Sequence, residues 1–270
     1  MKLFGVLGDP ISHSLSPVMH NAAFKSLKMD CEYHAFRVST SALYNAIHGA
    51  YALGFGGLNL TIPLKEKALE IVRPVPLAKE IGAVNTVDFK KGITGYNTDG
   101  LGARMALEGN GIRIRGKKVL LLGAGGAARA IALTLAKEKA DLTIVNRTAD
   151  RAEKLAYDIK AGKIRAGSFE DLKELVMNCD ILINSTSAGM YPNISETPVT
   201  SDMMNSDLTV FDIVYNPVNT LLLREARKAG AKAIDGVMML VYQGAEAFKI
   251  WTDIYPPVDV MEKAVREKLL

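Results

Sequence analysis

The sequence predicts an α/β protein built from two α/β domains, of which the second holds a doubly wound parallel sheet. Three observations support this prediction. The chain has 270 residues, which suggests two domains at about 150 residues each. Short apolar runs typical of buried strands alternate with helix-like segments almost throughout. A glycine-rich turn also joins one of these strands to the helix that follows it.

The first domain is expected at residues 1–100. Its segments switch repeatedly between strand and helix patterns. In chain order they are a strand at 2–8, a helix at 16–28, a strand at 31–38, a helix at 44–53, a strand beginning at 57 and the segment AVNTVDF at 83–89. The KKG sequence at residues 90–92 predicts a hairpin turn, and a helix is expected from Asp99.

The stretch GLNLTIPLKEKALEIV, residues 57–72, changes from a strand pattern to a helix pattern. Apolar residues alternate with Asn59 and Thr61 in its first half. Pro63 then ends the strand and suits the first turn of a helix that would run to residue 72. Lys65 follows closely, so a cation and two neutral polar groups gather where the strand ends. Strand ends on a rigid scaffold are frequent places for chemistry.

The second domain is expected at residues 101–236, and its pattern becomes more regular after the stretch GNGIRIRGKK at residues 109–118. The expected strands are 119–123, 142–147, 181–186, 210–215 and 231–235, and the expected helices include 127–140 and 149–161. Buried strands that alternate with helices indicate a parallel sheet covered on both faces. The amphipathic segment 236–252 has no strand after it, so we expect helices at 237–270 to pack back onto the first domain.

A dinucleotide-binding signal lies in VLLLGAGGAA, where a buried strand runs into a glycine-rich turn and then a helix. Gly123, Gly125 and Ala128 match G-x-G-x-x-G/A, which makes the second domain Rossmann-type. The helix N-terminus would supply free N–H groups and a positive dipole end to a pyrophosphate. The expected cofactor-binding residues here are Gly123, Ala124, Gly125, Gly126 and Ala127. The alternative is a tight strand-to-helix turn without a ligand.

The end of the next strand favours NADP over NAD. An NAD site usually has an Asp or Glu there, which binds the ribose 2′-hydroxyl. This strand ends instead in Asn146, Arg147 and Thr148, with Arg151 close behind. Two arginines and a hydroxyl suit a phosphate dianion. The alternative is that the arginines are solvated residues of one helix face and that Thr148 is only an N-cap.

Composition excludes several classes of function. Hydrophobic residues make up 49% and charged residues 23%, and the net charge is +4 with lysines and arginines spread along the chain. We therefore expect no nucleic-acid partner, and an anionic small molecule fits as well. No apolar run is long enough to cross a bilayer. Two cysteines and four histidines show no ligand spacing, so no metal is expected. A cytoplasmic location is the default.

The remaining polar candidates suit a ligand with several hydroxyls and one carboxylate. They are Ser14, Ser16, Asn59, Thr61, Lys65, Asn85, Asp99, Tyr215 and Gln243. With these residues in place, the sequence resembles shikimate dehydrogenases. The matching motifs are SHSLSPVMHNAAF, NLTIPLKE, GAVNT, GYNTDG, GAGGAARA, NRT, NSTSAGM and DGVMMLVYQGAEAF, in family order over nearly the whole chain. The resemblance implies NADPH-dependent reduction of 3-dehydroshikimate to shikimate, a step toward chorismate and the aromatic amino acids.

The resemblance also implies roles for individual residues. Lys65 and Asp99 would form the catalytic pair, with Lys65 as the proton donor. Our hypothesis is that Asp99 orients Lys65 and hydrogen-bonds the reacting hydroxyl. Ser14 and Ser16 would hold the substrate carboxylate, Thr61, Asn85, Tyr215 and Gln243 would line the ring, and Asn59 would position the loop. Thr186, Met190, Ile213 and Gly236 match positions near the cofactor in the family.

Two other functions stay open at this point. One is a quinate/shikimate dehydrogenase with relaxed cofactor use, against which the NRT sequence and the paired serines argue. The other is a non-catalytic NADP(H)-binding regulator, against which Lys65 and Asp99 argue, because a sensor needs no proton donor there. A homodimer is left open as well.

Overall fold

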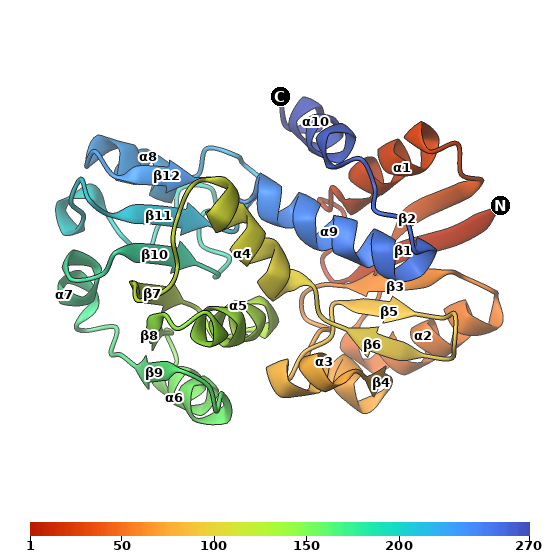
Figure 1. Ribbon diagram of the computed structural model, residues 1–270, viewed down its shortest axis with the longest axis horizontal. Coiled ribbons are helices and arrows are strands. Elements are labelled where there is room, and N and C mark those ends of the chain that lie inside the picture. Colours follow the sequence, from red (N-terminus) through yellow and green to blue (C-terminus); the bar gives the residue numbers. More distant parts are fainter. The chain divides into compact units, whose positions relative to one another are not determined.

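The computed structural model describes residues 1–270, which form two compact units (Figure 1). The first unit comprises Met1–Gly102 and Leu240–Lys268, and the second comprises Ala103–Met239. The division falls inside helix α4 (Asp99–Gly109) and helix α9 (Val237–Thr252).

A mixed six-stranded sheet forms the centre of the first unit. Its strand order is β2-β1-β3-β5-β6-β4. The bounds are β1 (Lys2–Gly8), β2 (Cys31–Arg37), β3 (Gly57–Leu60), β4 (Arg73–Pro74), β5 (Thr86–Asp88) and β6 (Thr94–Tyr96). β1, β2 and β3 are parallel, whereas β5 runs antiparallel to both β3 and β6. The predicted hairpin turn at residues 90–92 is confirmed, with Gly92 at a φ of +92°.

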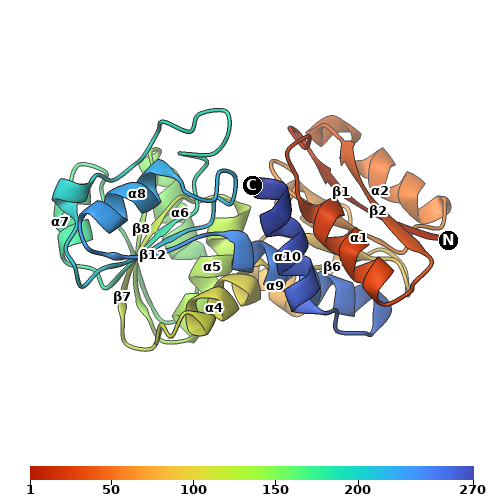
Figure 2. The same ribbon diagram turned by 90° about the horizontal axis from the view of Figure 1, so that it is seen from above.

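Helices cover both faces of this sheet (Figure 2). One face packs against α2 (Leu43–Ala52) and α3 (Pro76–Ile81) through a cluster that includes Ile47, Leu58 and Ala78. The other face packs against α1 (Ser16–Ser26) and α9, where Trp251 donates its indole N–H to the Val87 carbonyl at 3.0 Å. The unit also contains η1 (Thr40–Ala42), η2 (Lys67–Glu70) and α10 (Val258–Leu269).

The helix predicted after Pro63 is wrong in extent, because only the short 3₁₀ helix η2 forms within residues 63–72. Leu64 and Ala68 are fully buried, so the apolar spacing that suggested a helix is real. The Val84 N–H donates to the Lys65 carbonyl at 2.8 Å. This tertiary bond takes an acceptor that a regular helix would use, and the segment then enters β4 at Arg73.

The second unit holds a six-stranded sheet in which every strand pair is parallel, as the sequence predicted. Its order is β12-β11-β10-β7-β8-β9, which is the doubly wound dinucleotide-binding order. The strands are β7 (Lys118–Leu122), β8 (Asp141–Val145), β9 (Lys163–Ala166), β10 (Ile181–Asn184), β11 (Thr209–Asp212) and β12 (Lys232–Ile234). The edge strand β9 was not predicted, because Lys163 and Arg165 break its apolar run.

Five helical segments accompany this sheet. They are α5 (Gly126–Lys137), α6 (Ala149–Asp158), α7 (Leu172–Met177), η3 (Ser201–Met203) and α8 (Leu221–Lys228). Leu172, Val176, Leu222 and Leu223 from α7 and α8 bury one face of the strands. Strand order reverses between β7 and β10, and in such sheets ligands bind beyond the carboxyl ends of the strands at this point.

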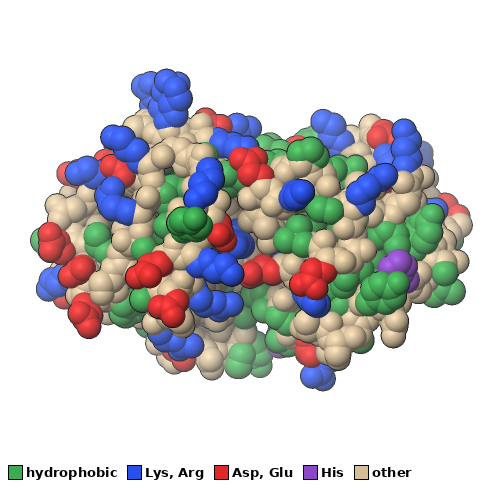
Figure 3. Space-filling view, turned by 90° about the horizontal axis from the view of Figure 1, so that it is seen from below, with side chains coloured by type: hydrophobic (Ala, Val, Ile, Leu, Met, Phe, Trp, Pro, Cys, Tyr) green, Lys and Arg blue, Asp and Glu red, His purple; other side chains and the backbone are tan.

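The surface carries charges of both signs. On the face shown in Figure 3, Lys and Arg side chains are interspersed with Asp and Glu side chains. None of the helices combines the length and the apolar character that a membrane crossing requires.

Candidate active site

Strand directions in the first unit bring three distant segments to one edge of the sheet. β3 ends at Leu60, and the segment leading to Lys65 follows it. Because β5 is antiparallel to β3, its beginning lies beside the end of β3, and Asn59 pairs with Thr86. β6 reverses direction again, so its end and Asp99 return to the same edge.

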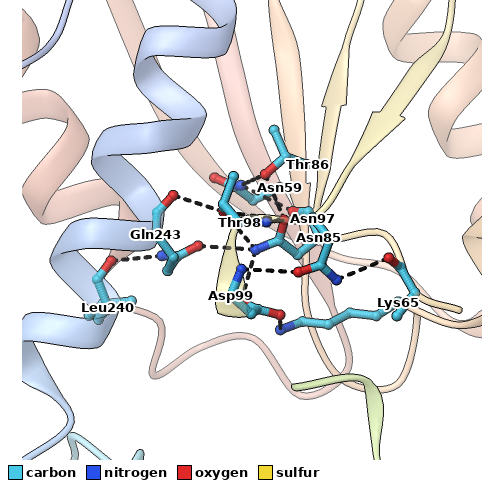
Figure 4. A network of polar contacts seen from close by, with 10 residues as sticks. Asn59, Lys65, Asn85, Thr86, Asn97, Thr98, Asp99, Leu240 and Gln243 are labelled. Atoms are coloured by element: carbon cyan, nitrogen blue, oxygen red, sulfur yellow. Dashed lines mark hydrogen bonds and ion pairs between the residues drawn. The ribbon is translucent and has the colours of Figure 1, made fainter. Parts of the chain in front are cut away.

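Lys65 and Asp99 meet there. Lys65 Nζ lies 2.7 Å from Asp99 Oδ2, and the two side chains are 15% and 5% exposed (Figure 4). Asn85 Nδ2 donates to the other carboxylate oxygen, Oδ1, at 2.8 Å. A buried charge is costly unless it is paired and hydrogen-bonded, and both conditions hold for Asp99. Asp99 also begins α4, where the helix dipole favours a carboxylate.

Amides and hydroxyls surround this ion pair. Gln243 of α9 lies beside Asn85, with Gln243 Oε1 at 3.4 Å from Asn85 Nδ2. Thr98 Oγ1 donates to the Gln243 backbone carbonyl at 2.9 Å and thereby ties α9 to the segment before α4. Asn59 Nδ2 donates to the Asn85 carbonyl at 3.1 Å. Neutral donors and acceptors around a single ammonium–carboxylate pair suit a polyol better than a metal ion.

Four other predicted substrate residues lie outside this network. Ser14 and Ser16 stand at the start of α1, where the Ser16 N–H donates to Ser14 Oγ at 3.3 Å. Thr61 follows β3 and pairs by its backbone N–H with the Leu7 carbonyl at 2.9 Å. The two serines and Thr61 therefore lie at the same edge of the sheet as Lys65. Tyr215 belongs to the second unit, just after β11.

The network contains residues that the sequence did not single out. Tyr33, Thr86, Asn97 and Thr98 all take part in its buried hydrogen bonds. Three of them lie in the motifs GAVNT and GYNTDG, so their closeness in sequence to Asn85 and Asp99 could have identified them. Tyr33 stands in β2, and no local pattern links it to the site.

The glycine turn of the second unit has the conformation that the fingerprint requires. Gly123 adopts a φ of +111°, which favours glycine, and it follows β7 directly. Gly125 precedes α5 with a φ of −87°, and a Cβ placed on it would meet no atom within 4 Å. Ala128 is fully buried. Ala124, Gly126 and Ala127 are half-buried. The open space at Gly125 and the α5 N-terminus fit a pyrophosphate.

The end of β8 presents the predicted polar groups to solvent. Arg147, Thr148 and Arg151 are exposed, and Asn146 Nδ2 donates to the Thr148 carbonyl at 2.9 Å. Thr148 occupies the N-cap position of α6, but its side chain makes no capping hydrogen bond. Its hydroxyl and the two guanidinium groups therefore fit a phosphate.

The remaining predicted cofactor residues lie on the loops that follow β10, β11 and β12. Thr186 follows β10, and its hydroxyl donates to Asn184 Oδ1 at 2.7 Å. Met190 is 37% exposed, and Ile213 is half-buried. Gly236 is buried, and a Cβ there would lie 2.4 Å from the Ile213 carbonyl oxygen. A packing requirement thus explains this glycine without any ligand.

Asp212, which the sequence did not single out, connects the end of β10 with the loop after β11. Its carboxylate accepts hydrogen bonds from Asn184 Nδ2 at 3.0 Å, from the Val214 N–H at 3.1 Å and from Thr220 Oγ1 at 2.7 Å. Burial raises the pKa of Asp212 to about 6, because these three hydrogen bonds only partly offset the loss of hydration. The position of Asp212 at a strand end was the available signal.

No three His, Cys, Asp or Glu side chains gather so that they could hold a metal ion. Cys31 and Cys179 are both free thiols.

Three family models match the chain. The model of the shikimate dehydrogenase substrate binding domain matches residues 6–87, and the model of shikimate / quinate 5-dehydrogenase matches residues 104–221. The model of the shikimate 5'-dehydrogenase C-terminal domain matches residues 236–266.

Individual relatives agree over the full length. The chain is 59% identical to the shikimate dehydrogenase (NADP(+)) of Methanosarcina mazei, over 99% of both chains. It superposes with a TM-score of 0.93 on a crystal structure of a shikimate dehydrogenase in complex with NADP+, at 44% identity over 100% of this chain and 96% of that one. For the Thermus thermophilus enzyme in complex with NADP(H) and shikimate, the TM-score is 0.90, with 38% identity over 99% of each chain. The chain therefore belongs to the shikimate dehydrogenase family.

Proposed function

We propose that this protein is an NADP-dependent shikimate dehydrogenase, an oxidoreductase that reduces 3-dehydroshikimate reversibly to shikimate in chorismate and aromatic amino acid biosynthesis. The observation that carries the proposal is the largely buried pair of Lys65 and Asp99, 2.7 Å apart and surrounded by amides and hydroxyls. A proton donor in such surroundings suits the reduction of one carbonyl on a ring that bears hydroxyls.

The protein residues supply the proton and the orientation. NADPH, when bound, supplies the hydride that reduces the carbonyl carbon. Lys65 Nζ donates the proton to the carbonyl oxygen, and its charge stabilises the negative charge that develops on that oxygen. Asp99 accepts one N–H of Lys65, which leaves other donors of the ammonium for the substrate. Asn85 holds the second oxygen of Asp99 and so fixes the plane of the carboxylate.

We assign substrate binding to the polar groups at the carboxyl edge of the first sheet. Ser14 and Ser16 would bind the carboxylate through their hydroxyls. Asn59, Thr61, Asn85, Asp99 and Gln243 are the proposed contacts to the ring and its hydroxyls, and Tyr215 of the second unit stays a prediction from the sequence. A ligand that satisfies these groups has both a carboxylate and several hydroxyls, which is the chemistry of shikimate.

We assign NADP to the second unit. The α5 N-terminus and the residues Gly123, Ala124, Gly125, Gly126 and Ala127 would bind the pyrophosphate. Asn146, Arg147, Thr148 and Arg151 would bind the 2′-phosphate, because no carboxylate stands at the end of β8. Thr186, Met190, Ile213 and Gly236 are proposed near the nicotinamide end.

A steady-state assay with two substrates and two cofactors tests the proposal. Shikimate and quinate are each offered with NADP+ and with NAD+, and the reduced-nicotinamide absorbance is followed. We expect the largest kcat/KM for shikimate with NADP+. Comparable values for quinate with NAD+ would instead identify a quinate/shikimate dehydrogenase, which is the reading that one of the matching family models also allows.

A non-catalytic NADP(H)-binding regulator gives a different result in the same assay. Such a protein would bind NADP+ in a calorimeter and produce no absorbance change with either substrate. The intact Lys65–Asp99 pair argues against this alternative, because a binding protein does not need an ammonium paired with a carboxylate beside its ligand.

Location and assembly are separate proposals. Two free thiols fit a reducing compartment, so we place the protein in the cytoplasm. A homodimer remains a prediction, and sedimentation velocity of the purified chain tests it.

A further inference from the structure

We propose that Tyr33 is a positioning residue for the catalytic pair, and that it acts through a chain of buried side-chain hydrogen bonds that ends at Asp99. The inference rests on the proposed function, because it concerns the same reaction. Tyr33 lies in β2, two strands away from the strand that leads to Lys65, and its hydroxyl donates to Asn59 rather than to either member of the pair.

The hydrogen-bond chain has four links. Tyr33 Oη donates to Asn59 Oδ1 at 2.7 Å, and Asn59 Nδ2 donates to Thr86 Oγ1 at 3.0 Å. Thr86 Oγ1 donates to Asn85 Oδ1 at 2.9 Å, and Asn85 Nδ2 donates to Asp99 Oδ1 at 2.8 Å. None of these five residues is more than 5% exposed, so water does not compete for their polar groups.

The direction of every link follows from the carboxylate. An ionised Asp99 only accepts hydrogen bonds, so Asn85 must turn its amide nitrogen toward it. The Asn85 oxygen then accepts from Thr86, whose single hydroxyl proton is used in that bond. Thr86 must therefore accept from the amide nitrogen of Asn59, which leaves the Asn59 oxygen facing Tyr33. The phenol is the donor that this oxygen requires.

Rotating the Asn59 amide by half a turn would break the hydrogen-bond chain at several points. Asn59 Nδ2 also donates to the Asn85 backbone carbonyl at 3.1 Å. The flipped amide would set its oxygen against this carbonyl and against a hydroxyl that has no spare proton. Tyr33 also disfavours the flip, because the flipped amide would take away the oxygen to which the phenol O–H now donates.

Tyr33 is itself held rigidly. The side chain of Asn21 binds both backbone groups of Tyr33, at 2.9 Å and 2.8 Å. The His20 ring stacks on the phenol ring with centroids 4.4 Å apart and planes 11° apart. His20 is fully buried without a hydrogen-bond partner, and burial lowers its pKa to about 3, so the stacked ring is neutral. A fixed phenol gives the hydrogen-bond chain a fixed starting point.

The consequence for catalysis concerns the plane of the Asp99 carboxylate. Asn85 holds Oδ1 while Lys65 lies on Oδ2, so a displaced Asn85 turns the carboxylate and moves the ammonium. We expect Tyr33→Phe to lower kcat by about threefold to tenfold, the rate equivalent of one buried hydrogen bond. The KM for NADP+ should not change, because all five residues of the hydrogen-bond chain belong to the first unit.

The test uses four variants and one control in shikimate oxidation with NADP+. Tyr33→Phe and Thr86→Val each remove one hydroxyl of the hydrogen-bond chain, and the double variant removes both. Thr86→Ser keeps the hydroxyl and should stay within about twofold of the wild-type kcat, less than the loss of one buried hydrogen bond. Tyr44→Phe removes an exposed phenol of the same unit and should leave kcat unchanged.

Coupling between the two hydroxyls distinguishes positioning from packing. If both act through one hydrogen-bond chain, the double variant is no slower than the slower single variant. Multiplied losses in the double variant, or wild-type kcat in Tyr33→Phe, would overturn the inference. If Tyr33→Phe fails to fold by thermal unfolding, equal kcat values for Thr86→Val and Thr86→Ser would overturn it. A wild-type protein that does not oxidise shikimate would refute the proposed function, and the inference would fall with it.

Discussion

Replacing Gly125 by alanine should leave the fold intact and weaken NADP(H) binding, whereas replacing Gly123 should mainly destabilise the fold. The two glycines belong to the same turn, so they form a matched pair. Gly125 has a φ of −87°, which any residue adopts, and a methyl group on it would point into space free of protein atoms within 4 Å. The structure therefore offers no folding reason for a glycine at Gly125.

The expected stability change for Gly125→Ala is small. Alanine is a poorer N-cap than glycine, which costs about 0.5–1 kcal/mol. The reduced entropy of the unfolded chain returns about 0.4–1 kcal/mol, so the net change should stay within about 1 kcal/mol. The methyl group would, however, occupy the space that a pyrophosphate needs to approach the backbone. We expect the Kd for NADP+ to rise by about tenfold or more, which corresponds to about 1.4 kcal/mol.

Gly123→Ala, in contrast, should mainly destabilise the fold. Its φ of +111° strains any residue with a Cβ, at about 1–3 kcal/mol. That Cβ would lie 2.6 Å from Ser185 Oγ, which donates to the Leu122 carbonyl. Displacing this hydroxyl costs about 1 kcal/mol more. A total of about 2–4 kcal/mol should lower the Tm by roughly 5–15 °C for a unit of this size.

Calorimetry measures both quantities on the same samples. Differential scanning calorimetry reports the Tm, and titration with NADP+ reports the Kd. Wild-type NADP+ affinity in Gly125→Ala would refute the assignment of its open space to the cofactor. A large drop in Tm for the same variant would show that the glycine serves folding. A Gly123→Ala variant as stable as the wild type would contradict the strain argument.

Three further predictions address the proton donor, the cofactor preference and a buried acid. Lys65→Ala should lower kcat by about 10²–10⁴ while NADP+ affinity by titration stays unchanged, and turnover near the wild-type value would remove Lys65 from its assigned role. The double variant Arg147→Gln/Arg151→Gln should raise the KM for NADP+ by about tenfold and leave the KM for NAD+ unchanged, since it removes two phosphate partners; equal losses for both cofactors would speak against a 2′-phosphate site. Asp212 has a pKa of about 6 in the folded protein against an ordinary value of 3.8, so the folded state takes up the proton at a higher pH than the unfolded state does. The free energy of unfolding of the wild type should therefore rise by up to about 3 kcal/mol relative to Asp212→Asn as the pH falls from 7 to 4. Urea unfolding of both proteins at several pH values measures this difference, and a constant difference would show that Asp212 does not titrate in the folded state.

The second unit was largely predictable because its signals are local. The strand, the glycine turn and the α5 helix are contiguous in sequence, and the positive φ of Gly123 is a requirement of short-range geometry. The missing carboxylate after β8 is also visible in the linear chain. Where no apolar run marked an element, as in β9 with Lys163 and Arg165, the pattern failed.

The edge of the first unit where Lys65 and Asp99 meet depends on strand directions that periodicity does not encode. Asn85 and Asp99 reach Lys65 only because β5 runs antiparallel to its neighbours, and an all-parallel sheet would have placed Asn85 at the opposite edge. The motifs named these residues through family resemblance, but the distance of 2.7 Å between Lys65 and Asp99 belongs to the fold.

The linear sequence thus determined the class of fold and the glycine turn of the second unit, because the strand, the turn and the helix are contiguous in the chain. Tertiary structure alone decided that residues 63–72 form only a short 3₁₀ helix, because the Val84 N–H donates a hydrogen bond to the Lys65 carbonyl. It also decided that Tyr33 reaches Asp99 through three intervening side chains. A hydrogen bond between residues far apart in sequence forms only after the sheet has brought them together, so no local sequence pattern predicts it.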